Sequence, residues 1–239
     1  MHLYSTLTPW YDLVDPVEDH LEEAESYERA LLSAVDGPAA TLLELGAGAG
    51  NNAYFMKRRF RCTLADLSPQ MQTLSRARNP DCEHILGDMR DLRLGRTFDA
   101  VFVHDAVAYM TTREELLAVA RTAFEHTRPG GAALFAPDYV REAFNEASNL
   151  IEGQNGGRAL RGIEWCWDPD PQDTTYAVEY MFLLREGDQV TSIHDRHLEG
   201  LFSEREWHEV LAAAGFEVTT IARDIPDAQT DRIFLCRRR

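Results

Sequence analysis

Residues 42–50 read LLELGAGAG, in which apolar residues and the single acid Glu44 lead directly into three glycines at alternate positions. This pattern predicts a buried strand over residues 41–45 that ends in a tight loop, because backbone without Cβ atoms can approach a ligand closely. The next residues, 51–59, are expected to form a helix whose first N–H groups face that ligand. The loop therefore indicates a site for a dinucleotide, a phosphate or another small molecule.

Strand and helix signals alternate on both sides of this loop. Further strands are expected over residues 62–65, 82–86, 98–103 and 132–136, and helices over residues 15–35, 68–78 and 112–127. Such alternation is typical of a parallel sheet with right-handed crossovers. A capping box at Ser203–Glu206 then predicts a helix that ends at Ala214, and residues 216–222 and 232–236 are expected to complete the sheet.

The alternation is interrupted after Pro137. Residues 152–162 are polar and rich in glycine, and three runs typical of strands follow at residues 163–167, 174–184 and 189–197. We interpret residues 138–200 as an antiparallel β insertion, or lid, within a single domain that spans residues 1–239. The tryptophans at 165 and 167 share one face of their strand, as do Tyr176, Tyr180 and Phe182, and such faces are more often sheet core than substrate wall.

Composition limits the class of partner. The net charge is −16, from 40 acidic and 24 basic residues, which argues against a nucleic-acid partner and favours a neutral or cationic small molecule. The four cysteines lack the spacing of metal ligands and suit free thiols, so we expect a cytoplasmic protein without a metal site. No run approaches the ~20 apolar residues of a membrane span, so no membrane partner is expected.

The glycine spacing argues against a pyrophosphate. A dinucleotide loop follows the pattern G-x-G-x-x-G, whereas the sixth position here is Asn51. Asp66, at the end of the second strand, is instead placed to accept hydrogen bonds from ribose hydroxyls, and Asp88 follows the third strand, where a carboxylate can receive an exocyclic amino group. Three apolar neighbours suit the faces of a purine: Leu67, Met71 and Met89.

Taken together, five ordered motifs resemble those of class I S-adenosylmethionine-dependent methyltransferases of the small-molecule type. They are ELGAGAG at 44–50, ADLS at 65–68, LGDM at 86–89, FDAV at 98–101 and RPGG at 128–131. The resemblance implies an α/β fold with a Rossmann-like, seven-stranded, mainly parallel sheet, helices on both faces and an antiparallel last strand. It also implies S-adenosylmethionine as the cofactor, with the β insertion over the active site.

The resemblance also implies roles for individual residues. The glycine loop would take the methionyl part of the cofactor, Asp66 the ribose, and Asp88 with Met89 the adenine. The segment PWYDL at 9–13 is similar to one that lays a tyrosine, here Tyr11, over the methionyl end. The full expected cofactor set is Tyr11, Glu44, Gly46, Ala47, Gly48, Asp66, Leu67, Met71, Asp88, Met89 and His104.

Methyl transfer from a sulfonium depends mainly on orientation and exclusion of water, and a base is needed only where the acceptor must lose a proton. His104 follows the fourth strand and is a candidate either for the cofactor wall or for the general base. His194 and His197 should fall on opposite faces of one strand, and His197 is the favoured second catalytic candidate.

We therefore expect an enzyme that moves a methyl group to a nitrogen or oxygen of a small-molecule acceptor. One alternative is a non-catalytic protein that binds the cofactor as a sensor or assembly partner. A nicotinamide oxidoreductase is disfavoured by Asn51. Exposed strands in the insertion could also form the surface of a homodimer.

Overall fold

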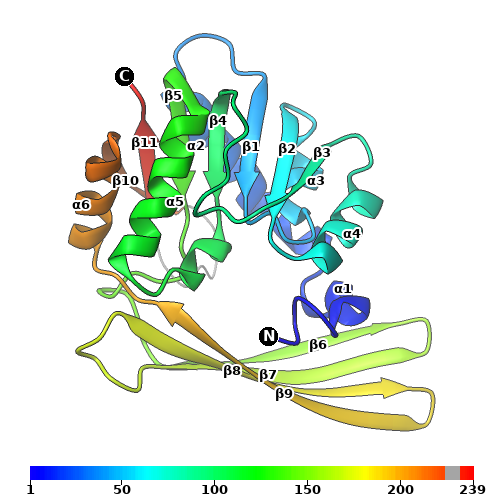
Figure 1. Cartoon of the computed structure of the whole chain (residues 1–239). Helices are drawn as coiled ribbons and strands as arrows, with labels where there is room; N and C mark the ends of the chain where they lie inside the picture. The colour runs from blue at the N-terminus through cyan, green and yellow to red at the C-terminus, as the bar shows by residue number, and fades with distance from the viewer. Residues whose placement is uncertain (224–231) are drawn as a thin grey trace.

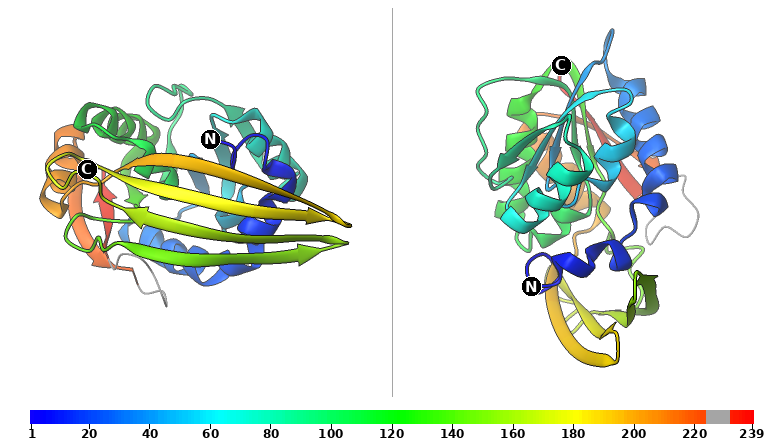
Figure 2. Two further views of the ribbon diagram at one scale, coloured as in Figure 1. Left: turned by 90° about the horizontal axis from the view of Figure 1, so that it is seen from below. Right: turned by 90° about the vertical axis from the view of Figure 1, so that its right-hand side faces the viewer.

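The computed structural model describes residues 1–223 and 232–239, and these residues form two sheets (Figure 1). The larger sheet has seven strands in the order β10-β11-β5-β4-β1-β2-β3, and the smaller has four in the order β6-β7-β8-β9. The smaller sheet lies across the carboxyl ends of the parallel strands, and the N-terminal segment lies between the two sheets (Figures 1 and 2).

The seven-stranded sheet confirms the predicted fold. Its parallel strands are β1 (Thr41–Leu45), β2 (Arg61–Asp66), β3 (Glu83–Leu86), β4 (Phe98–Val103) and β5 (Thr127–Phe135). The last strand, β11 (Arg232–Arg237), is antiparallel both to β5 and to β10 (Glu217–Ala222). Because the carboxyl ends of parallel strands meet at one edge, the loops after β1, β2, β3, β4 and β5 converge beneath the sheet.

Helices cover both faces of this sheet (Figure 1). On one face, α2 (Leu21–Ala34) and α3 (Asn51–Met56) pack, and α5 (Arg113–His126) and α6 (Glu204–Ala214) pack on the other. The remaining helices are η1 (Thr8–Trp10), α1 (Tyr11–Val14), η2 (Val17–His20), α4 (Pro69–Arg78) and η3 (Asp105–Tyr109). Among residues 1–223 and 232–239, no helix is both long and apolar enough to cross a membrane.

Two predicted helix boundaries were wrong. The helix expected from Asp15 begins as the 3-10 turn η2 at Val17 and becomes α-helical only at Leu21, because the Asp15 carboxylate binds His20 and Asn51 instead of capping the helix. The helix after the glycine loop ends at Met56 rather than at Arg59.

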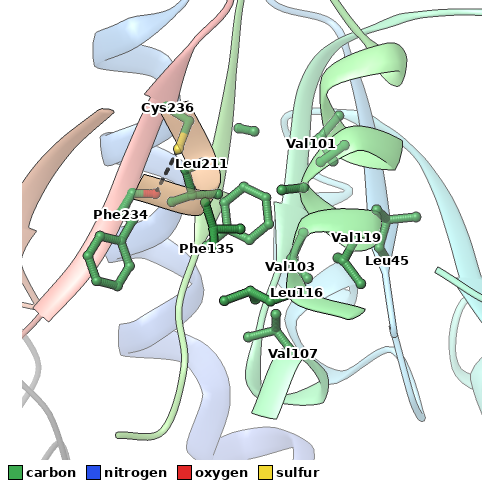
Figure 3. Packing of buried hydrophobic residues seen from close by; sticks show 14 of the residues in the cluster. Leu45, Val101, Val103, Val107, Leu116, Val119, Phe135, Leu211, Phe234 and Cys236 are labelled. Carbon is green, nitrogen blue, oxygen red and sulfur yellow. Dashed lines mark hydrogen bonds between the residues drawn. The ribbon is translucent and has the colours of Figure 1, made fainter. Parts of the chain in front are cut away.

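The main core lies between the sheet and the α5–α6 face. Alternate residues of the central strands, Leu45, Val101 and Val103, point into it and meet Leu116, Val119 and Leu211 from the helices (Figure 3). The side chain of Trp207 on α6 stacks on Phe234 of β11, with ring centroids 4.9 Å apart. This packing fixes the sheet whose edge carries the functional loops.

The insertion has four strands where three were predicted. They are β6 (Ala147–Asn155), β7 (Arg158–Trp167), β8 (Thr175–Glu186) and β9 (Gln189–Gly200), all antiparallel. The glycine-rich stretch 152–162 is the end of the β6–β7 hairpin, with Gly156 and Gly157 at φ 54° and 90° in its turn. Since β6 is a largely exposed edge strand, its polar residues do not disfavour the strand.

The two faces of this sheet differ in burial. Tyr176 and Phe182 are buried and Tyr180 packs with them, all directed toward the larger sheet, as predicted for core aromatic residues. Trp165 and Trp167 stack on each other at 5.5 Å, but they lie on the outer face, where Trp165 is 41% exposed. The expectation that these tryptophans form sheet core was therefore wrong.

The capping box of α6 gives a direct test of this fold. The Ser203 hydroxyl accepts a hydrogen bond from the Glu206 N–H at 3.2 Å, while the Glu206 carboxylate accepts one from the Ser203 N–H at 2.9 Å. We expect Ser203→Ala to lower the free energy of unfolding by about 0.5–2 kcal/mol, as measured by urea denaturation. Ser33→Ala, an exposed change within α2, is the control and should have little effect. Equal stability of the two variants would contradict the role of this cap.

Candidate active site

The glycine loop after β1 has the conformation that its sequence predicts. Gly46, Gly48 and Gly50 have φ angles of 75°, 54° and 71°, in the left-handed region that favours glycine. A Cβ atom at Gly46 would lie only 2.3 Å from the Cβ of Ala106 in η3. The N–H groups of Gly46 and Ala47 both donate to the Ala65 carbonyl, which fixes the loop against β2.

Asp66 connects this loop to the end of β2. Its carboxylate accepts hydrogen bonds from the Gly48 and Ser68 N–H groups, each at 2.7 Å. Burial raises the pKa of Asp66, and these two donors oppose that shift. A carboxylate has about four acceptor positions, so Asp66 can still receive ribose hydroxyls.

The apolar residues expected around a purine lie near this carboxylate. Leu67 follows Asp66 and is 65% exposed, while Met71 on α4 is buried, with its methyl carbon 3.9 Å from the Cβ position of Gly48. The sulfur of Met89 lies 3.7 Å from the Cβ position of Gly46. The structure thus brings residues from the ends of β1, β2 and β3 to one edge.

Two of the expected acids have particular surroundings. Asp88 forms an ion pair with Arg90 at 2.7 Å, which lowers the pKa of this carboxyl. Glu44 is buried on β1, and burial raises its pKa to about 8. Its Oε2 atom has no hydrogen-bond partner among the residues that the structure describes.

The N-terminal segment is attached to the glycine loop through Asp15. The Tyr11 hydroxyl donates to Asp15 at 2.9 Å, and Asn51 Nδ2 donates to the same oxygen at 2.8 Å. His20 contacts the other Asp15 oxygen at 2.7 Å and Glu23 at 2.6 Å. Burial lowers the pKa of His20, but these hydrogen bonds outweigh it and raise the pKa to about 10.

Sequence reasoning missed this network. Asn51, which occupies the position where a dinucleotide loop would need glycine, was the sequence feature that could have indicated this network.

A cavity of about 300 Å³ opens between the N-terminal segment, the loops after β4 and β5, and the inner face of the smaller sheet. Its polar wall is strongly acidic, with the carboxylates Asp15, Asp105, Asp138, Glu164 and Glu199. The aromatic part of the wall consists of Tyr4, Tyr11, Tyr109, Tyr139, Tyr176 and Tyr180. Carboxylates and the faces of tyrosine rings both attract cations, so this cavity suits a positively charged small molecule.

His104 lies behind the cavity wall. Its Nε2 atom is 3.1 Å from the Tyr27 hydroxyl and 2.9 Å from Nη2 of Arg223, and burial lowers its pKa to about 4. A neutral imidazole whose Nε2 accepts from Arg223 cannot readily take a proton from a ligand. His104 was one of the two candidate catalytic residues, and the geometry instead suits a positioning role.

His197 is the other candidate, and it is also fully buried. Its Nδ1 atom is 2.8 Å from the Tyr109 hydroxyl, and its Nε2 atom is 3.1 Å from Asp195. His194 lies on the outer face of β9 and pairs with Glu179 at 2.7 Å, so the two histidines do face opposite ways as predicted. Neither His104 nor His197 lines the cavity.

Removal of the Asp66 carboxylate should weaken cofactor binding. We expect Asp66→Ala to cost about 1–3 kcal/mol in affinity for S-adenosylhomocysteine, because an acceptor for the ribose and the tie to Gly48 are both lost. Calorimetric titration measures this loss. The matched control is Asp81→Ala, an exposed carboxylate before β3 that pairs with Lys57. Equal affinity of the Asp66→Ala variant and the unmodified chain would remove Asp66 from the cofactor site.

Comparison with known proteins agrees with this geometry. Residues 42–131 match a family described as a methyltransferase domain. The chain is 32% identical over 183 residues to the dTDP-3-amino-3,4,6-trideoxy-α-D-glucopyranose N,N-dimethyltransferase of Streptomyces venezuelae, covering 75% of this chain and 76% of the relative. It is 27% identical over 215 residues to the dTDP-3-amino-3,6-dideoxy-α-D-glucopyranose N,N-dimethyltransferase of Streptomyces fradiae, covering 87% and 82%.

Solved structures resemble the whole chain. DesVI of Streptomyces venezuelae superposes with a TM-score of 0.86 at 27% identity, covering 99% of this chain and 98% of DesVI. An amino pentose methyltransferase from Micromonospora echinaspora, solved with bound S-adenosylmethionine, gives a TM-score of 0.80 at 25% identity, covering 92% and 91%. With its glycine loop, its strand-end residues and these relatives, the chain belongs to the class I S-adenosylmethionine-dependent methyltransferases.

Proposed function

We propose that this enzyme methylates the amine nitrogen of a small amino sugar. The chain is a methyltransferase that uses S-adenosylmethionine and acts on a small molecule. The finer choice of nitrogen over oxygen is supported by the acidic side chains and tyrosine rings of the cavity wall, because an amine reaches the enzyme mainly as a cation and a hydroxyl does not. The names of the relatives, which are amino-sugar N,N-dimethyltransferases, support the same choice.

The geometry serves an in-line displacement. When bound, the cofactor supplies an activated methyl group on its sulfonium. Gly46 and Ala47 would hold its methionyl end, and Tyr11, on the cavity wall, would cover that end. The inner face of the smaller sheet then closes the site from below, which keeps water away from the reacting atoms (Figure 2).

We further propose that residues 1–239 act as one catalytic unit with residues 138–200 as its lid. The expected cofactor residues are assigned as before, with Asp66 on the ribose and Asp88 with Met89 on the adenine. His104 and His197 are assigned to positioning: His104 orders Tyr27 and Arg223, and His197 orders Tyr109. The non-catalytic alternative has no observation in its favour.

A second copy of the chain is the partner that we propose for the outer face of the smaller sheet. Across β6, β7 and β8 the register places Leu150, Ile163 and Met181 in one row, all exposed. Other exposed apolar residues of the same face are Trp165, Leu183 and Leu198. Both signs of charge flank them, with Arg161 paired to Glu152 and Arg196 to Glu179, so the face is complementary to itself.

We also propose that the enzyme is cytoplasmic and has no nucleic-acid partner. The four cysteines are free thiols, which suits a reducing compartment. The net charge of −16 opposes contact with a phosphate backbone.

The choice of acceptor atom can be tested directly. We expect the enzyme, with S-adenosylmethionine, to methylate dTDP-3-amino-3,4,6-trideoxy-α-D-glucopyranose or dTDP-3-amino-3,6-dideoxy-α-D-glucopyranose once or twice on nitrogen, as measured by mass spectrometry. The matched sugars with a hydroxyl in place of the amine should remain unmodified. Methylation of the hydroxyl sugars alone would contradict the choice of nitrogen. Tight binding of S-adenosylhomocysteine without methylation of any amine or hydroxyl acceptor would favour the non-catalytic alternative.

The homodimer is tested by sedimentation. The unmodified chain is expected to sediment as a dimer and Met181→Arg as a monomer, because a charge in the apolar row opposes its burial. Leu21→Arg, an exposed leucine on α2, is the control and should remain dimeric. A monomeric unmodified chain, or a dimeric Met181→Arg variant, would contradict this interface.

A further inference from the structure

Two carboxyl groups of the cavity wall lie where methyl transfer would take place. Asp105 follows β4 and Asp138 follows β5, and these strands are neighbours, with Val103 paired to Phe135. The backbone pairing continues past the strands, because the Ala136 N–H donates to the Val103 carbonyl at 2.9 Å. Both carboxyl groups line the same cavity, and each affects the pKa of the other.

Asp105 also lies close to the glycine loop. The next residue, Ala106, is the one whose Cβ excludes any side chain at Gly46. Asp105 therefore lies between the loop that takes the methionyl end and the cavity that takes the acceptor.

The other acids of the wall already have hydrogen-bond donors. Asp15 receives Tyr11 and Asn51, Glu164 receives the Tyr180 hydroxyl at 2.8 Å and Asn149 at 3.1 Å, and Glu199 receives the Tyr176 hydroxyl at 2.5 Å. These donors fix the orientation of the three side chains.

The Asp105–Asp138 pair differs in this respect. In the part of the chain that the structure describes, no donor outside the pair binds the Asp138 carboxylate. The Oδ1 atom of Asp105 is buried 3.0 Å from Nε2 of His104 and 3.8 Å from Nη2 of Arg223, which also binds Tyr27 and His104. Asp138, which lines the cavity, is therefore the member of the pair that is free to accept a proton from a ligand.

We propose that Asp138 is the proton acceptor of the methyl transfer and that Asp105 positions it. This inference rests on the proposed N-methylation. It names the residue that converts the bound ammonium into a nucleophile, a step that neither His104 nor His197 is placed to perform.

The reaction consists of a proton transfer followed by a methyl transfer. The substrate R–NH3⁺ gives one proton to the Asp138 carboxylate and becomes R–NH2. The nitrogen lone pair then forms the C–N bond as the C–S bond breaks, and the electron pair of that bond stays on sulfur. The product R–NH2⁺–CH3 can give up a proton in the same way once the first has left to solvent, which allows a second methylation after exchange of the cofactor.

The surroundings support a division of roles within the pair. Burial, followed by the neighbouring Asp138, raises the pKa of Asp105 well above its usual range. Burial raises the pKa of Asp138 only to about 6, so it is mostly ionised at neutral pH. The charged and titratable groups that interact with the pair are Glu23, His104, Glu164, Glu199, Arg223, Cys166, Tyr4, Tyr11, Tyr27, Tyr139 and Tyr176.

Isosteric substitutions separate the two residues. With whichever amino-sugar nucleotide the unmodified enzyme methylates, we expect Asp138→Asn to lower kcat by about 10²-fold or more, the usual contribution of a positioned base. Asp105→Asn keeps an uncharged donor beside Asp138 and should retain at least about tenfold more activity than Asp138→Asn. Asp188→Asn, in the exposed β8–β9 turn, is the control and should behave as the unmodified enzyme.

The pH profile distinguishes a proton acceptor from a residue that only supports the fold. For the unmodified enzyme, kcat/KM should rise with pH as Asp138 ionises near pH 6 and then level off. In Asp138→Asn this limb should disappear, and activity should instead rise at higher pH, as the free substrate amine loses its proton without help. Affinity for S-adenosylhomocysteine should be unchanged in Asp138→Asn, which shows an intact cofactor site.

These measurements distinguish failure of the proposed function from failure of the role of Asp138. If the unmodified enzyme methylates no amine, the proposed function fails. If it does methylate an amine but Asp138→Asn keeps a kcat within about threefold or keeps the limb near pH 6, the role of Asp138 is overturned. Loss of S-adenosylhomocysteine binding in Asp138→Asn would also overturn it, because the carboxylate would then support the fold of the site.

Discussion

The close approach of η3 to the glycine loop is the constraint on which the rest of the site depends. At Gly46 any side chain would overlap Ala106, and the same approach brings Asp105 close to the glycine loop. The approach is possible because β1 and β4 are hydrogen-bonded neighbours with Leu45 beside Val103, so both loops leave the sheet at the same level. The proposed cofactor and acceptor sites therefore lie at adjacent strand ends.

The charges around the cavity are arranged in two layers. The inner layer, which lines the cavity, carries five acidic side chains and the imidazole of His20. The cation Arg223 lies behind it, near Glu23 and Asp105, and the fixed position of this guanidinium limits the repulsion between the acids. Buried carboxylates without full partners destabilise a fold, and this arrangement keeps several of them near the reacting atoms. A cationic acceptor would supply the missing positive charge on binding and offset this loss of stability.

The fold could be predicted closely from the sequence because the signals were local. The strands β1 and β4 have the predicted bounds, and the cap of α6 is the predicted one. The errors have tertiary causes: Asp15 binds His20 and Asn51 rather than capping a helix, and β6 is a strand because it pairs with β7, although its own residues are polar. For the proposed cofactor site, the strand-end acids and glycines were sufficient to place the expected residues at one edge of the sheet, because strand order brings them together.

The acceptor site was less accessible to sequence reasoning, since its carboxylates come from segments that are far apart in the chain. Asp105 and Asp138 had no motif, whereas His104 attracted attention because histidine is the usual base at neutral pH. Only the structure shows that Arg223 faces His104 Nε2, which leaves that nitrogen poorly suited to accept a proton. A carboxyl pair also suits an amine better than an imidazole would: in its ionised form it attracts the ammonium, and by accepting the proton it removes the charge that bound the substrate. The same carboxyl pair would therefore first attract the ammonium and then remove its proton. The methylated product, once neutral, is held less strongly than the ammonium that entered.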